Sequence, residues 1–129
     1  MANYIYTIWR RKTATAQIKL FEGAGKNTIN GKDAKEYVTR NDLFDVLYSG
    51  LKLCGVKDSF YFEVKVEGSG ISSQIQAIRL GLSRALSEKD EKFKKSLKEA
   101  WFLTRDARKV ERKKPWLHKA RKASQWSKR

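Results

Sequence analysis

The sequence has very few of the residues from which metal sites and disulfides are built. Its 129 residues include one cysteine, one histidine, one methionine and one proline. A lone cysteine cannot form an internal disulfide, which favours a reducing compartment, and we expect Cys54 to be a small buried apolar residue. A zinc site usually needs four ligands, of which Cys54 and His118 could supply only a part. We therefore expect no bound metal and no cofactor.

A set of catalytic residues is missing as well. His118 has Lys113, Lys114, Lys119 and Arg121 as sequence neighbours, and their positive charges disfavour its protonated form. A nucleophilic pair of Cys54 and His118 would have no third residue to orient it. We expect His118 to make an ordinary polar contact and the protein not to be an enzyme.

Long apolar runs are also absent. No stretch approaches the ~20 consecutive apolar residues that span a bilayer. The N-terminal residues lack the basic and then apolar layout of a secretory signal. Pro115 and the scattered apolar positions around it make a poor amphipathic anchor for a membrane surface. We expect a cytoplasmic protein with no membrane partner.

Positive charge is what the sequence has in excess. Lysine and arginine number 29 against 14 aspartates and glutamates, a net charge of +15, which favours a polyanionic partner. Residues 104–129 hold 11 of these cations and two of the acids, a net +9 that leaves +6 for residues 1–103. The C-terminal charges have few aliphatic neighbours and cannot build a core. The sequence predicts a globular body over 1–103 and an extended basic tail over 104–129.

Within the body, alternation of apolar and polar residues predicts strands over 4–9, 14–20 and 60–67. The dipeptide Asn30-Gly31 predicts a turn that leads from a short strand into a helix. Asn41 is the expected cap of the next helix. The body is therefore expected to mix strands and helices.

After Gly70 the apolar period becomes helical. Ile71, Ile75, Ile78, Leu82 and Leu86 fall on one stripe of a predicted helix. A further predicted helix carries Phe93, Leu97, Ala100 and Trp101. The expected core consists of Ile18, Leu20, Phe60, Phe62, Val64, Ile75, Ile78, Leu82 and Leu97.

The basic tail is the main candidate for nucleic-acid binding. Arginine offers planar, paired contacts to phosphate, and such dense positive charge stays extended without a polyanion. Trp116 and Trp126 are expected either to stack on bases and riboses or to pack back onto the body. The candidate residues of the tail are Arg105, Arg108, Lys109, Arg112, Lys113, Lys114, Trp116, Lys119, Arg121, Lys122 and Trp126.

Two short segments of the body are further candidates. Arg10, Arg11 and Lys12 lie between the first two predicted strands, either as an RNA contact or as a solvated hairpin end. Gly68-Ser69-Gly70 lies between a strand and a helix, where glycine lets a backbone approach phosphate at a helix N-terminus. The alternative is a tight turn that needs positive φ. The segment lacks the remaining residues of a mononucleotide or dinucleotide loop.

Several blocks of sequence, in a fixed order, resemble the universal small-subunit ribosomal protein nine family in its bacterial form. The resemblance covers nearly the whole chain. The N-terminal blocks are Tyr6, Arg10-Arg11-Lys12-Thr13-Ala14, Ala16, Ile29-Asn30-Gly31 and Tyr37. The central blocks are Gly68, Gly70, Gln74, Ala77-Ile78-Arg79, Gly81 and Arg84-Ala85-Leu86. The C-terminal blocks are 103–108, 110–114, 119–122 and 125–129.

The resemblance implies an α+β fold with two layers, a mostly antiparallel sheet with helices on one face. It also implies the left-handed βαβ crossover found in the second domain of small-subunit ribosomal protein five. The implied function is structural, in the head of the small subunit, with ribosomal RNA and neighbouring head proteins as partners. It adds Arg79 to the RNA-binding residues. It implies that the tail threads through ribosomal RNA and that Ser127, Lys128 and Arg129 contact tRNA in the P site.

This sequence departs from the family pattern at a few positions. Trp9, Ser73 and Trp116 stand where the family usually has glycine, Ile75 where it has alanine and Trp126 where it has phenylalanine. A tryptophan in place of glycine requires a φ value that a bulky residue can hold, or a locally different packing.

Rival interpretations remain at this point. A nucleic-acid-binding regulator outside the ribosome would form defined dimers or bind specific bases, and would not migrate with ribosomal subunits. A membrane-surface protein and an enzyme are disfavoured for the reasons given above.

Overall fold

The computed structural model describes residues 4–105 and, beyond them, Arg108, Arg112, Pro115, Trp116, His118 and Arg121. Most of the predicted tail lies outside the described residues, and the boundary at 103 stays a prediction. The strands are β1 (Tyr4–Arg11), β2 (Ala14–Glu22), β3 (Thr28–Ile29), β4 (Lys32–Asp33) and β5 (Phe60–Glu67). The helices are α1 (Ala34–Tyr37), α2 (Asn41–Cys54), α3 (Ile71–Lys89) and α4 (Glu91–Glu99).

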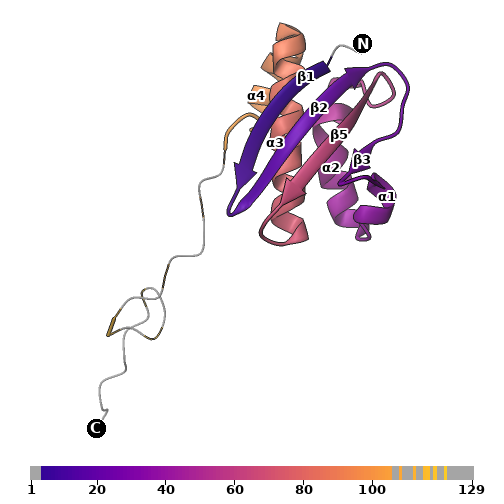
Figure 1. Cartoon of the computed structure of the whole chain (residues 1–129). Coiled ribbons are helices and arrows are strands. Elements are labelled where there is room, and N and C mark those ends of the chain that lie inside the picture. The colour runs from indigo at the N-terminus through magenta and orange to yellow at the C-terminus, as the bar shows by residue number, and fades with distance from the viewer. Residues whose placement is uncertain are drawn as a thin grey trace.

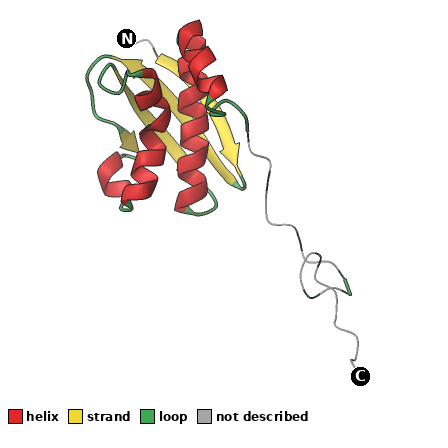
Figure 2. Cartoon of the chain, turned by 180° about the vertical axis from the view of Figure 1, so that it is seen from behind, coloured by secondary structure: helices red, strands yellow, loops and turns green. Residues whose placement is uncertain are grey.

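The strands form one mixed sheet in the order β1-β2-β5-β3-β4. β2 pairs antiparallel with β1 and β5, whereas β3 pairs parallel with β5. The helices lie behind the sheet in Figure 1 and in front of it in Figure 2. In Figure 1, β5 runs downward to the left of β3, so the chain that joins them through the helix layer makes a left-handed crossover. The predicted two-layer α+β fold is confirmed.

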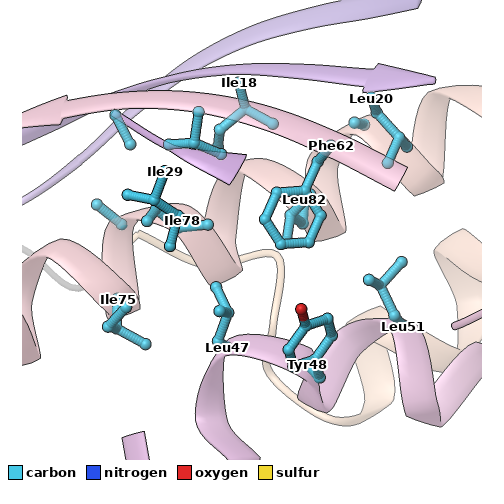
Figure 3. Close-up of a cluster of buried hydrophobic side chains, with 14 of the residues drawn as sticks. Ile18, Leu20, Ile29, Leu47, Tyr48, Leu51, Phe62, Ile75, Ile78 and Leu82 are labelled. Carbon is cyan, nitrogen blue, oxygen red and sulfur yellow. The ribbon is translucent and has the colours of Figure 1, made fainter. Parts of the chain in front are cut away.

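The core lies between the sheet and the helices (Figure 3). Alternate residues of β2 and β5 point into it because successive side chains of a strand take opposite faces. The longer helices contribute their apolar stripes, with Leu47 and Leu51 from α2 and Ile78 from α3 fully buried. Every residue of the expected core is buried, so that prediction is confirmed.

Small residues let α3 lie close to the sheet. Ala14 and Ala16 of β2 are fully buried on the face toward the helices. A Cβ atom at Gly81 would lie 1.9 Å from the Cδ1 atom of Ile18. The hydroxyl of Thr7 on β1 donates a hydrogen bond of 3.2 Å to the carbonyl oxygen of Gly81. This contact fixes the position of α3 across the first two strands.

The turn at Asn30-Gly31 differs from the prediction. It closes a hairpin between β3 and β4, and α1 begins only after β4. Asn30 and Gly31 have φ values of 54° and 80°, as a two-residue hairpin turn requires.

Helix ends account for the other differences. Asn41 is the first residue of α2 and not its cap, a position taken by Arg40, whose guanidinium pairs with Asp42. Ile71 is the first residue of α3 and is 42% exposed, so it does not belong to the buried stripe. Trp101 follows the end of α4 with φ 66°. Its backbone N–H bonds Lys98 and that of Phe102 bonds Leu97, which closes the helix as a Schellman motif.

Replacing Ile78 with alanine is expected to lower the free energy of unfolding by ~2–5 kcal/mol, because it removes a fully buried side chain and leaves a cavity. Ile71→Ala on the same helix removes the same atoms from a site that is 42% exposed and serves as the control. Urea denaturation followed by circular dichroism measures both. Equal losses for the two variants would contradict the packing of α3 against the sheet.

Candidate nucleic-acid interface

Arg10, Arg11 and Lys12 lie where β1 turns into β2. Arg10 pairs with Thr15 and is exposed on the face of the sheet away from the helices. Arg11 is half-buried on the face toward the helices. Lys12 has φ 54° in the turn itself. The predicted cluster therefore spreads its charges over both faces of the sheet at one end of the body.

The loop from Gly68 to Gly70 crosses directly against this turn. Gly68 has φ 84°, and a Cβ atom there would lie 2.5 Å from the carbonyl oxygen of Thr13. Glycine is needed at this position for positive φ and for the close approach of two backbones, which supports the tight-turn interpretation. Gly70 has no atom within 4 Å of a Cβ position, so the space beside it is open.

The N-terminus of α3 begins at that open space. Gly70 occupies the N-cap position, and no side chain caps the helix within the described residues. The first backbone N–H groups of a helix carry partial positive charge and bind anions such as phosphate. We call Arg10, Arg11, Lys12, the loop 68–70 and the first turn of α3 the basic end of the body.

Gln74 and Tyr37 support the loop of the basic end. The Nε2 of Gln74 donates a 3.0 Å hydrogen bond to the carbonyl oxygen of Gly68. The hydroxyl of Tyr37 donates to the Oε1 of Gln74. Neither role follows from composition or periodicity, although both residues are among the blocks that resemble the ribosomal family. The contact joins α1 to α3 across positions 37 residues apart.

Arg11 connects the basic end to the start of the C-terminal segment. Its Nε donates a 2.7 Å hydrogen bond to the Oε1 of Gln76 on α3. Its Nη1 donates to the backbone carbonyl oxygen of Arg108. Arg108, which follows the last core residue Leu103, therefore lies beside the turn between β1 and β2.

Arg79 has a packing role that the sequence did not predict. Its guanidinium lies 5.0 Å from the ring centroid of Phe102, over the ring face. Burial lowers the pKa of Arg79 from its ordinary value, but a guanidinium keeps its charge in proteins. Arg79 holds the chain after α4 against α3, and whether it also contacts RNA remains a proposal.

Trp9 and Arg84 form a second cation–π contact, which the sequence did not predict. The Cζ of Arg84 lies 4.7 Å from the ring centroid of Trp9. Trp9 is half-buried in β1 without positive φ, so it replaces the usual glycine through packing. Trp116 replaces glycine differently, because it has φ 69° and is 94% exposed.

The remaining tail candidates differ in what the structure shows of them. Arg105 is half-buried, and Arg108, Arg112, Arg121 and His118 are exposed. The other candidates lie outside the described residues: Lys109, Lys113, Lys114, Lys119, Lys122, Trp126, Ser127, Lys128 and Arg129.

Ion pairs neutralise cations elsewhere on the body. Among the described residues the recorded pairs are Arg40–Asp42, Lys52–Asp45 and Lys89–Glu22. None of them includes Arg10 or Lys12. The positive charge of Arg10 and Lys12 is therefore not cancelled by a paired carboxylate within the described chain.

Cys54 is half-buried and packs against the core. Burial raises the pKa of its thiol, which keeps it protonated and unreactive at neutral pH. In the described part of the chain, no three residues among histidine, cysteine, aspartate and glutamate gather as a metal site would require. Among residues 4–105 and the six described beyond them, no helix is long and apolar enough to cross a membrane.

Replacing Gly68 with alanine is expected to lower the free energy of unfolding by more than the ~1–2 kcal/mol of a left-handed φ, because the methyl group also meets Thr13. Gly70→Ala, in open space with φ −96°, is the control. Thermal denaturation compares the two, and equal stability would mean that the loop does not press against the turn.

Comparison with known proteins agrees with this arrangement. The family model described as ribosomal protein S9/S16 matches residues 9–129. The match includes the basic end, the glycine loop, α3 and the whole C-terminal basic segment. The chain therefore belongs to the ribosomal protein S9 family, structural RNA-binding proteins of the small subunit of the cytoplasmic ribosome.

Proposed function

We propose that the basic end of the body and the segment 104–129 form one continuous contact with ribosomal RNA in the head of the small subunit. The observation that carries this proposal is the double contact of Arg11. One guanidinium holds Gln76 at the start of α3 and the backbone of Arg108 at the start of the tail. The cations of the tail thus begin where those of the body lie.

The chemistry of the basic end suits a phosphate backbone. Arg10 is exposed, Lys12 is half-buried in the turn, and the uncapped start of α3 adds partial positive charge. Contacts of this kind position a protein on RNA and carry little sequence information. They fit a structural component whose binding site is set by the shape of the folded RNA.

We also propose that residues 1–103 form the body and 104–129 the RNA-bound tail, with other head proteins as neighbours. The tail contributes a net +9 from its sequence. Its last residues, Ser127, Lys128 and Arg129, are proposed to contact P-site tRNA. From Arg121, eight further residues can reach at most about 26–29 Å, and Lys128 and Arg129 supply charge for a tRNA backbone.

RNA affinity is expected to fall steeply with salt. If the protein neutralises ~6–10 phosphates, the affinity for a ribosomal RNA fragment drops by roughly 10³–10⁵ between about 50 and 200 mM salt. The double variant Arg10→Gln, Lys12→Gln should reduce the slope of log affinity against log salt by about 0.7–0.9 for each phosphate that it no longer neutralises. Filter binding measures both quantities.

The double variant Arg40→Gln, Lys52→Gln removes the same charge from residues that are ion-paired on the body. It should leave the slope nearly unchanged. If both double variants reduce the slope equally, the net charge and not the basic end determines binding.

Deleting Ser127, Lys128 and Arg129 is expected to weaken P-site tRNA binding while subunits still assemble. The deletion removes two side-chain charges that can reach a phosphate backbone but leaves nine cations of the tail for ribosomal RNA. Because phosphate contacts carry little base information, different tRNAs should be affected alike. Toeprinting at limiting tRNA measures occupancy, and sucrose gradients measure assembly.

The matched control for this deletion is Lys119→Gln, Lys122→Gln, which removes two tail charges farther from the C-terminus. It should affect tRNA occupancy less. If truncated and intact subunits show equal tRNA occupancy at raised salt, the last three residues contact ribosomal RNA and not the tRNA.

A further inference from the structure

The face of the sheet away from the helices is uncovered and carries aromatic side chains. Figure 1 looks onto this face, with β1, β2 and β5 nearest the viewer. Tyr4, Tyr6 and Ile8 of β1 point to it and are 49%, 46% and 44% exposed. Within the described chain no helix or further strand lies over this face (Figure 1).

In one row on this face, the aromatic rings pack against one another. Tyr4 lies 5.3 Å from Phe21, and Phe21 stacks on Tyr61 at 4.9 Å, centroid to centroid. Tyr6 lies in the next row, where its register partner is Lys19. Tyr6 has no ring partner among the described residues, so its face is available for stacking.

A hollow of about 730 Å³ opens beside Tyr6, between β1 and the strands β5 and β3. Its charged and polar lining comes from Gln17, Lys19, Thr28, Asn30, Glu63 and Lys65. This volume falls in the range of about 300–1,000 Å³ typical of small-molecule sites. An aromatic ring, two ammonium groups and one carboxylate therefore line the same concave surface.

The charged side chains that line the hollow, all in the described part of the chain, do not form ion pairs with one another. Lys19 and Glu63 are register partners on β2 and β5, yet the Nζ of Lys19 lies over the ring of Tyr4, 5.3 Å from its centroid. Within the described chain no ion pair involves Glu63 or Lys65. The carboxylate of Glu63 is thus left to accept hydrogen bonds from a ligand.

We propose that this hollow binds one unpaired nucleotide of RNA, with its base stacked on Tyr6 and its phosphates near Lys19 and Lys65. The proposal rests on RNA being the ligand of this chain and adds a second contact, separate from the basic end. Bases stack on aromatic side chains and lysines attract the backbone. A docked protein is the poorer fit, because the cores of protein interfaces are depleted in lysine and glutamate.

Glu63 gives the site a base preference. A carboxylate accepts a hydrogen bond from the N4 amino group of cytosine. Uracil presents the O4 oxygen at the same place, which is also an acceptor and is repelled. Its only ring donor, N3–H, is flanked by the O2 and O4 oxygens, which repel an approaching carboxylate. The hollow should therefore prefer cytidine to uridine.

The test uses the full-length protein with single-stranded oligocytidine and oligouridine of equal length. Equal length gives both oligomers the same backbone charge, so contacts by the basic tail cancel in the comparison. At raised salt we expect oligocytidine to bind at least about five-fold more tightly, the lower limit for one good base contact. Fluorescence anisotropy of labelled oligomers measures the ratio.

Two pairs of variants identify the site. Glu63→Gln should abolish the preference for cytidine, whereas Glu67→Gln, on the same strand and face but outside the hollow, should keep it. Tyr6→Leu should weaken the binding of both oligomers by about five-fold or more, because the base can no longer stack on a ring. Trp101→Leu, which removes an exposed aromatic ring outside the hollow, should change little.

Amide chemical shifts of the unaltered protein give a measurement independent of variant folding. Oligocytidine should move the resonances of Tyr6, Thr28 and Lys65, and duplex RNA should not. If both oligomers bind equally and the shifts stay confined to the basic end, this site is overturned while the proposed function stands. If neither RNA binds at low salt, the proposed function fails with it.

Discussion

The close contact of α3 with the sheet at Gly81 is the constraint on which the rest of the structure depends. The helix backbone approaches Ile18 so closely that a Cβ at this position would lie 1.9 Å from its Cδ1 atom. Because the interior of a protein is close-packed, α3 cannot move along the sheet without opening voids. Its N-terminus is thereby held against the turn between β1 and β2. The basic end is a consequence of that packing.

The same packing divides the sheet into two faces with different roles. The face toward the helices carries Ile18, Phe62 and Val64, and burying them supplies the main driving force for folding. The other face is free to keep charged and aromatic side chains, since it contributes little to the core. Its register brings Tyr6, Lys19 and Glu63 into one row. The face toward the helices thus contributes to stability, and the opposite face of the same sheet carries the side chains available for binding.

Two tryptophans show that the same departure from the family pattern has different physical solutions. Trp9 keeps an extended backbone in β1, and its ring is covered by the guanidinium of Arg84. Trp116 keeps a glycine-like φ of 69° with its ring in solvent, a conformation that costs a bulky residue about 1–3 kcal/mol when it is held. A ligand that stacks on Trp116 would offset that cost.

The sequence by itself determined the fold class, the strands β1, β2 and β5, the helix α3 and the core. Hydrophobic periodicity is a local signal, and Phe60, Phe62 and Val64 carry it without knowledge of their partners. The sequence also located the positively charged residues and the glycine loop 68–70. Helix ends and the hairpin at Asn30-Gly31 were placed less well, because capping and turn pairing depend on neighbouring backbone. Only the tertiary structure decided that Arg11 joins α3 to Arg108, that Arg79 packs on Phe102 and that Tyr6 and Glu63 share a hollow. Those contacts join residues far apart in the chain, and no periodicity encodes which distant side chains the packing of α3 and the strand register will bring together.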